Sequence, residues 1–383
     1  MNNIILYRKL MKFVHDSGMR FHDIRIANTF CWAMTGLILS EKISLGQWGL
    51  HRAGRRLASS AVRQFSRWLH NERIWVWDIY SKLLQHMLRD WKEPFWIAVD
   101  TTVLWDTFVM IEVSLIYRGR ALPLAWKVLE QSSAAVAFAH YKSLLIDVAL
   151  LIPLDHRTVL LADRGFTDTN LMKLCRDLGW HFRIRAKLSL LVDTGRGQRK
   201  LRTLLPQAGK AHMWHNVFIS GKQLGPLHLA LARLENANGS DPWAILSDEP
   251  TDLQTFEEYG LRFDIEELFL DEKSAGFQLE DSRLRTIPAL ERLQLILATA
   301  TIYLVSTGTA IVEMGRRRWV DPHWQRGLSY FQIGWRWVRL ALDHGLKLLD
   351  FPWLADCPDP SPAISSEVQF LHRAPPVLAL SCF

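Results

Sequence analysis

Two aspartates stand directly after short apolar runs that are typical of buried strands. Asp100 follows residues 95–99, and Asp163 follows residues 157–162. A carboxylate at the end of a buried strand is costly to desolvate unless a partner offsets its charge. Divalent cations are common partners, and a pair of them can hold the attacking and leaving oxygens of a phosphodiester. Either Asp alone is weak evidence because such residues also cap helices, but together they favour a metal site.

A third acid lies on a predicted helix. Four polar residues of this helix fall within an arc of about 60°, namely Tyr259, Arg262, Glu266 and Lys273. The opposite arc, which can face the core, holds Leu261, Ile265 and Leu268. One carboxylate between two cations and a phenol suits a metal ligand flanked by groups that grip phosphate. The spacing alone leaves an alternative open, which is a surface helix with an Arg262–Glu266 ion pair.

The segments that must position these acids alternate between strand-like and helix-like patterns. In chain order we predict a strand at 95–99, a hairpin of 108–116 and 121–129, a helix at 134–151, a strand at 157–162, a helix at 167–178 and a strand at 181–184. This order predicts an α/β fold in which helices flank a mixed sheet.

We expect the acids to lie in a core that is interrupted once. Its first part would span residues 94–185 and its remainder residues 241–310, with a mostly β insertion subdomain at 186–240. Two further segments follow the core. Residues 311–350 are predicted to be helical, and the Pro-rich residues 351–383 are predicted to be irregular.

The N-terminal residues 1–93 are predicted to be helical and are distinctly basic. They hold 15 Lys/Arg and 7 Asp/Glu, whereas the remaining chain holds 31 and 32. A basic segment joined to a neutral body is typical of nucleic-acid enzymes. Within it, Arg63 and Arg67 share one side of a predicted helix and are candidate DNA contacts. A charged, solvated helix face is the alternative.

Several other classes of protein are disfavoured. The four Cys form no CxxC pair, which argues against a disulfide framework or a zinc site and fits a reducing cytoplasm. The sequence contains no Gly-rich phosphate loop, which argues against ATP use. The most apolar stretch, residues 290–307, is broken by charges and predicts a buried helix rather than a membrane span.

The spacing Tyr-x2-Arg-x3-Glu-x6-Lys from Tyr259 to Lys273 resembles the signature of cut-and-paste bacterial transposases of the insertion-sequence 4 type. Residues 99–102 and 161–166 resemble the contexts of that family's first and second catalytic aspartates. The resemblance covers about residues 95 to 290, and the motifs occur in the family's order.

This resemblance implies an RNase H-like fold in which Asp100, Asp163 and Glu266 are catalytic and hold two Mg²⁺ or Mn²⁺. It also implies that one DNA strand is nicked at the transposon end and that the freed 3′-OH attacks the other strand to give a hairpin, which is reopened before strand transfer. Tyr259, Arg262 and Lys273 would hold phosphates near the cleaved bond. We expect the three carboxyl groups to lie on the order of 4–8 Å apart.

The family also places a Trp at the end of its β insertion to receive a base that leaves the stack during hairpin formation. Trp243 is the matching residue, and a core Trp is the alternative interpretation. The resemblance further implies that a homodimer binds double-stranded DNA, both at the transposon ends and at the target. It implies a protein of the bacterial cytoplasm that does not bind a membrane.

Two other functions remain possible from the sequence. One is an RNase H-like nuclease that cuts DNA without strand transfer. The other is a non-catalytic DNA-binding derivative of a transposase, against which the presence of all three acids argues. The basic and aromatic residues between 316 and 339 are expected to contact DNA, to pair two subunits, or to form a solvated face.

Overall fold

The computed structural model describes residues 2–52, 54, 57–219, 224–236, 239–273, 277, 279–282, 284–351 and 353–361. The helices in this part of the chain are α1 (Asn2–Asp16), α2 (Ile24–Ser40), α3 (Leu45–His51), α4 (Ala58–Leu69), α5 (Val76–Leu88), α6 (Phe138–Ala149), α7 (Thr169–Asp177), α8 (Gln254–Gly260), α9 (Phe263–Lys273), α10 (Ile287–Glu313) and α11 (Tyr330–His344).

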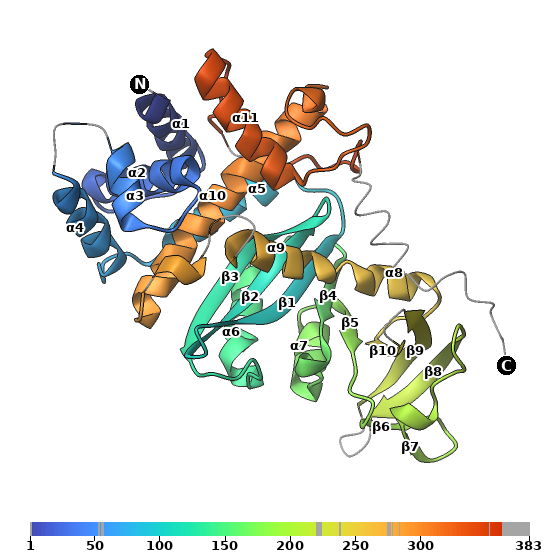
Figure 1. Cartoon of the computed structure of the whole chain (residues 1–383). Coiled ribbons are helices and arrows are strands. Elements are labelled where there is room, and N and C mark those ends of the chain that lie inside the picture. Colours follow the sequence, from blue (N-terminus) through green and yellow to red (C-terminus); the bar gives the residue numbers. More distant parts are fainter. Residues whose placement is uncertain are drawn as a thin grey trace.

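The strands form one continuous mixed sheet (Figure 1). They are β1 (Phe95–Leu104), β2 (Phe108–Tyr117), β3 (Arg120–Glu130), β4 (Thr158–Ala162), β5 (His181–Arg185), β6 (Leu191–Asp193), β7 (Gln198–Lys200), β8 (Ala211–Ile219), β9 (Leu224–Asn236) and β10 (Gly239–Ser247). Their spatial order is β3-β2-β1-β4-β5-β10-β9-β8-β6-β7. The predicted mixed sheet with flanking helices is therefore confirmed.

The half of the sheet that carries the acids combines two kinds of pairing. β4 lies parallel to both β1 and β5, whereas β2 pairs antiparallel with β1 and β3. Helical crossovers connect the parallel strands, as parallel pairing requires. α6 leads from β3 to β4, and α7 leads from β4 to β5.

Strand β4 is buried on both of its faces, and successive residues pack on different helices. Val159 and Leu161 belong to a small cluster with Ile265 and Leu268 of α9. Leu160 and its neighbours on the same face belong to the main core. Side chains alternate along a strand, so the next residue after Ala162 points to the face that α9 covers.

The predicted β insertion is an extension of the same sheet. β10 pairs antiparallel with β5 on one side and with β9 on the other. The strand predicted near Trp243 is thus present, but it spans the expected boundary at residue 240. The sheet is continuous because β5 presents a free edge after β4, and β10 satisfies the backbone groups of that edge.

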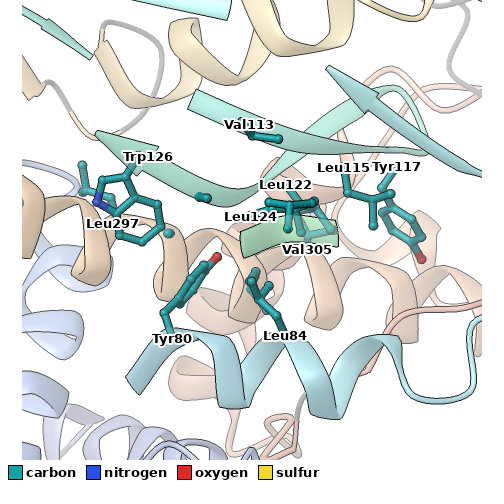
Figure 2. Packing of buried hydrophobic residues seen from close by; sticks show 14 of the residues in the cluster. Tyr80, Leu84, Val113, Leu115, Tyr117, Leu122, Leu124, Trp126, Leu297 and Val305 are labelled. Atoms are coloured by element: carbon teal, nitrogen blue, oxygen red, sulfur yellow. The ribbon is translucent and has the colours of Figure 1, made fainter. Parts of the chain in front are cut away.

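The main core lies between the sheet and α5, α6, α7 and α10. Figure 2 shows Tyr80 and Leu84 of α5 facing β3, and the Tyr80 hydroxyl donates a hydrogen bond to the backbone oxygen of Pro123 at 2.7 Å. Leu297 and Val305 of α10 lie in the same layer. α10 is long and apolar enough to span a membrane by composition, but its apolar stretch is completely buried inside the fold. The predicted buried helix at residues 290–307 is confirmed.

Helices α10 and α11 approach each other through two glycines. A Cβ on Gly308 would lie 2.0 Å from the backbone oxygen of Tyr330, and one on Gly334 would lie 1.8 Å from that of Leu304. Any larger residue at either position would force the helices apart.

The predicted helical region at 311–350 contains the end of α10 and all of α11, with an irregular connection between them. The described residues from 351 to 361 form no helix or strand.

One charged group of the core has a direct effect on stability. Glu112 of β2 is fully buried, and it accepts hydrogen bonds from Ser114 Oγ at 2.6 Å and Gln294 Nε2 at 3.1 Å. Burial raises the pKa of Glu112 to about 7, although these two hydrogen bonds oppose the rise. The folded protein therefore retains a proton that the unfolded chain releases at lower pH.

We predict that Glu112→Gln makes the protein more stable at pH 8 but not at pH 4.5. The stability that Glu112 contributes is present below the unfolded pKa, near 4.3, and is lost as the pH rises through about 7. Urea unfolding should show a gain for the variant at pH 8 on the order of 1–3 kcal/mol. Glu130→Gln, an exposed control at the end of β3, should not change the pH profile. An equal effect of Glu112→Gln at both pH values would contradict this prediction.

Candidate active site

Asp100 and Asp163 lie side by side on neighbouring parallel strands. The register pairs Val99 of β1 with Ala162 of β4, so Asp100 and Asp163 each directly follow one member of this pair. By alternation, Asp100 shares a face with Ala98, and Ala98 packs in the cluster under α9. Both acids therefore face α9.

The prediction that both acids end their strands is wrong for Asp100. β1 continues to Leu104, and Asp100 pairs with Glu112 of β2 within the antiparallel ladder. β4 does end before Asp163, which begins a turn. The difference arises because the antiparallel partner of β1 is longer than its parallel partner. Asp100 is consequently held by a continuous strand, whereas Asp163 stands at an open strand end.

The prediction of one helix from Tyr259 to Lys273 is also wrong. α8 ends at Gly260, and α9 begins at Phe263. Between them the amides of Leu261 and Arg262 bond to carbonyls three residues earlier, at 3.3 and 3.0 Å, as in a tight 3₁₀ turn. Gly260 has low helix propensity and weakens the helix at this point.

The tight turn changes where the polar residues face. Tyr259 is fully buried rather than part of an exposed stripe. Arg262 is 4% exposed and reaches back to the sheet. Ile265 and Leu268 are buried against the sheet as predicted. Glu266 has a half-exposed side chain.

The Arg262 guanidinium bridges two of the predicted catalytic acids. Its Nη1 donates to Asp100 Oδ2 at 2.8 Å, and its Nη2 donates to Glu266 Oε1 at 2.6 Å. The ion pair between Arg262 and Glu266, which the sequence allowed as an alternative, is thus present, but its cation is buried. The two carboxylates lie within the span of one planar guanidinium, a geometry that Arg is suited to hold.

Asp163 and Tyr259 complete the group with polar atoms that lack partners. The Asp163 carboxylate makes no hydrogen bond or ion pair with the described residues, and it does not cap the turn that follows it. The Tyr259 hydroxyl is buried beside the Arg262 side chain, which interacts with its oxygen, but its own proton has no acceptor among the described residues. Burial raises the pKa of Tyr259 to about 12, and the nearby charges of Arg262 and Asp163 act on it in opposite directions. A buried unsatisfied hydroxyl is costly unless a ligand satisfies it.

The charges of the site are strongly coupled. Burial, the largest effect, raises the pKa of Asp100 to about 6, while Arg262 lowers it and the carboxylates of Asp163 and Glu266 raise it. Burial would lower the pKa of Arg262, but Tyr259 and the carboxylates raise it above its ordinary value. Asp163 and Glu266 therefore both act on Asp100 at one end of the sheet.

Sequence reasoning missed a second cation beside these acids. Arg185 ends β5 next to β4, where Ala162 pairs with Ile184. Its Nη2 donates to Asp241 Oδ1 at 2.7 Å, and its guanidinium lies 5.6 Å from the ring centre of Trp243. The sequence could have indicated Arg185, because it directly follows the strand predicted at 181–184. That strand pairs with the one that leads into Asp163.

Trp243 lies in the core in this structure. It is 2% exposed and packs with Phe256, Tyr259 and Phe263, and its indole Nε1 donates to Asp241 Oδ2 at 2.8 Å. The ring would receive an extruded base only if Phe263 or its neighbours moved. Its role toward a base stays a prediction.

The remaining predicted residues lie apart from the acids or outside the description. Lys273 is the last residue of α9, and its side chain lies outside the described part of the chain. Arg63 and Arg67 are exposed on α4, whose other side buries Phe65 and Trp68. α4 therefore offers a basic outer face, as predicted, but its contact with DNA is untested.

The residues fit divalent metal in donor chemistry. Carboxylate oxygens are the ligands that Mg²⁺ and Mn²⁺ prefer, and Asp163 offers an unpartnered carboxylate beside Asp100. The expected convergence is nevertheless partial. Within the described residues, no three His, Cys, Asp or Glu side chains are arranged to hold one ion, because Arg262 stands between Asp100 and Glu266. Glu266 is exposed enough to rotate away from Arg262 toward the aspartates.

Comparison with known proteins identifies the class. The family described as "Transposase DDE domain" matches residues 108–303, which include Asp163 and Glu266 and begin eight residues after Asp100. This match spans about half of the chain, and the chain belongs to the transposase DDE domain family.

Comparisons over the whole chain are weaker. No curated protein sequence matches this chain. Among seven matching chains of solved structures, one comes from the "Cryo-EM structure of piggyBac transposase synaptic complex with hairpin DNA". It is 9% identical with a TM-score of 0.40, and the alignment covers 95% of this chain and 89% of that one. A similarity of this degree does not establish a shared site.

We predict that Arg262→Met destabilises the protein by roughly 3 kcal/mol in EDTA, because it leaves Asp100 buried without its cation. The double variant Asp100→Asn/Arg262→Met should recover a large part of that loss. Glu266→Gln removes a partner whose side chain is 50% exposed, so it should cost less than about 1 kcal/mol. Urea unfolding of wild type, of the single variants Asp100→Asn, Arg262→Met and Glu266→Gln, and of the double variant measures these differences. Strictly additive effects of the Asp100 and Arg262 changes would show that the bridge contributes nothing.

We predict that Tyr259→Phe leaves the free energy of unfolding unchanged or slightly raises it, because the hydroxyl makes no well-formed hydrogen bond within the described residues. The same variant should cleave DNA about tenfold more slowly if the hydroxyl binds a phosphate oxygen. Tyr303→Phe is the matched control, since its buried hydroxyl donates to Leu349 O at 3.1 Å. This control should lose about 1 kcal/mol of stability and retain cleavage. A large loss of stability in Tyr259→Phe would refute this account of the hydroxyl.

Proposed function

We propose that this protein is a cut-and-paste DNA transposase of the insertion-sequence 4 type, which cleaves transposon ends and joins them to target DNA. The observation that carries the proposal is that Arg262, which is buried, bonds to both Asp100 and Glu266, while Asp163 adjoins Asp100 across the strands and acts electrostatically on the same Arg262. These acids come from β1, the end of β4 and α9, which lie far apart in the sequence. The family match supports nucleic-acid chemistry of the DDE type.

The core is proposed to be RNase H-like. Strands β3-β2-β1-β4-β5 would form its sheet, with the parallel strands in the middle and the antiparallel hairpin at one edge. Strands β6 to β9 would be the insertion that separates β5 from the helix with the third acid. The arrangement of the helical crossovers α6 and α7 supports this interpretation.

Asp100, Asp163 and Glu266 would hold two Mg²⁺ or Mn²⁺. When bound, these ions activate the attacking oxygen and stabilise the leaving oxygen of the phosphodiester. For these carboxylates to bind metal, Arg262 must release at least one of them. Its guanidinium would then be free to bind a phosphate oxygen, which Arg also binds in a bidentate manner.

The other side chains of the site would position DNA. The proton of the buried Tyr259 hydroxyl has no acceptor among the described residues, and a phosphate oxygen would accept it. Lys273 would contribute a further positive charge from the end of α9. Trp243 would receive a base if the excision proceeds through a hairpin. The exposed Arg63 and Arg67 on α4 would contact the DNA backbone.

The biological partners follow from this chemistry. A transposase must hold two transposon ends together, so we propose a homodimer on double-stranded DNA that includes the terminal repeats and the target. We further propose that it acts in the cytoplasm of a bacterium.

The proposal predicts that Asp100→Asn, Asp163→Asn and Glu266→Gln each lower the rate of DNA cleavage on the order of 10³-fold. Each change removes one of the carboxylates that would bind the metal ions. The substrate would be duplex DNA taken from both flanks of the coding gene, incubated with Mg²⁺ or Mn²⁺ and a target plasmid. Gels would resolve nicked, hairpin and joined products. Glu257→Gln, an exposed acid in the first turn of α8, is the matched control and should retain full activity.

The products separate this proposal from its alternatives. Nicking without joined products would favour an RNase H-like nuclease, and DNA binding without cleavage would favour a non-catalytic derivative. Cleavage that survives Glu266→Gln unchanged would remove Glu266 from the mechanism.

A further inference from the structure

The connection between α10 and α11 carries an exposed aromatic surface that the catalytic site does not explain. We name residues 315–325 the hook. Trp324 is 88% exposed and Trp319 is 57% exposed. Both indoles lie beside cations, with the Arg318 guanidinium 4.9 Å from the Trp324 ring centre and that of Arg316 5.7 Å from the Trp319 ring centre.

The hook is held in place by its own polar contacts. The side chains of Arg317 and Arg318 each donate through Nη2 to the backbone oxygen of Trp324, at 3.0 and 3.1 Å. Asp321 is completely buried and accepts from the amide of His323 at 3.2 Å and that of Gly327 at 3.1 Å. The exposed indole of Trp324 is therefore presented by an ordered loop, and preorganisation of this kind lowers the cost of binding.

The charge of the hook indicates a negatively charged partner. Arg316 and Arg318 are exposed and have no carboxylate partner among the described residues, and Asp321 is the hook's buried acid. An exposed indole that carries a guanidinium on its ring suits stacking on a base next to a phosphate. An apolar protein partner would not require unpaired cations on both indoles.

A series of contacts through the β2–β3 turn connects the residue after the hook to the helix with the third acid. Arg326, which follows the hook, donates through Nη2 to the backbone oxygen of Arg118 at 3.4 Å in the β2–β3 turn. Two residues later, Arg120 pairs with Asp271 of α9 at 3.1 Å. Asp271 lies five residues beyond Glu266, about 8 Å along the helix axis. A DNA flank leaving the catalytic site in this direction would reach the hook.

We propose that the hook binds DNA by stacking Trp324 on an unpaired base, with Arg316 and Arg318 on the adjacent phosphates. This inference rests on the proposed function only in its choice of DNA as the partner, because it concerns a surface outside the catalytic group. It predicts a preference for distorted or single-stranded DNA over intact duplex.

The test is fluorescence anisotropy of the full chain in EDTA with three labelled probes: a duplex, the same duplex with an unpaired internal loop, and a single strand. Trp324→Ala should weaken binding to the looped and single-stranded probes about tenfold, with less than about a twofold effect on duplex. Trp324→Phe should restore most of the affinity, since a phenyl ring also stacks. Trp75→Ala is the matched control, because Trp75 is 70% exposed on α5's N-terminal side, and it should bind like wild type.

Three results would overturn the inference. Trp324→Ala could leave the affinity for all three probes unchanged, or it could weaken the affinity for duplex and unpaired DNA equally. It could also change only the molecular mass of the protein measured by sedimentation, which would assign the hook to subunit pairing. The Asp100→Asn variant distinguishes this inference from the proposed function. If Asp100→Asn and wild type both fail to cleave but both show the dependence on Trp324, the proposed chemistry fails while the hook inference stands. Cleavage by wild type without any dependence on Trp324 is the reverse case.

Discussion

The candidate site depends on one buried guanidinium that holds acids from two distant segments of the chain. Arg262 contacts Asp100, 162 residues earlier in the sequence, and Glu266, one helical turn later. Asp100, whose side chain is only 17% exposed, would carry a large desolvation cost without this cation, and burial already raises its pKa to about 6. The same contact fixes the approach of α9 to the sheet. Charge compensation by Arg262 thus determines both where the third acid lies and how the first acid remains inside the fold.

The sheet provides the other half of the arrangement. Because β1 and β4 run parallel and in register, Asp100 and Asp163 emerge next to each other on the face that α9 covers. β1 is continued by its antiparallel partner, whereas β4 stops, so the two aspartates differ in rigidity and in exposure to partners. Asp100 is held within a continuous strand, Asp163 follows the end of a strand, and Glu266 is half-exposed. A divalent ion or a phosphate could rearrange these three side chains around Arg262 with little movement of the backbone.

Local patterns predicted the elements well, and long-range contacts explain the corrections. Apolar runs identified β1, β4 and β5, and the apolar composition of residues 290–307 identified a buried helix. Helical periodicity misplaced Tyr259, because it assumes a uniform turn and Gly260 allows a tighter one. The sequence also allowed the Arg262–Glu266 pair but could not show that Asp100 shares the same guanidinium, since that contact depends on how α9 packs on the sheet. The continuity of the insertion with the core sheet was likewise set by the free edge of β5.

The most direct test of the account is where a bound metal ion lies in the folded protein. Fe²⁺ can replace Mg²⁺ at carboxylate sites, and with ascorbate and peroxide it generates hydroxyl radicals that cut the nearby backbone. Mass spectrometry of the wild-type fragments should show cuts clustered around residues 100, 163 and 266, and Mg²⁺ or the Asp163→Asn change should suppress them. Cuts elsewhere in the chain, or cuts at these positions that persist after Asp163→Asn, would contradict the claim that the three acids form one metal site.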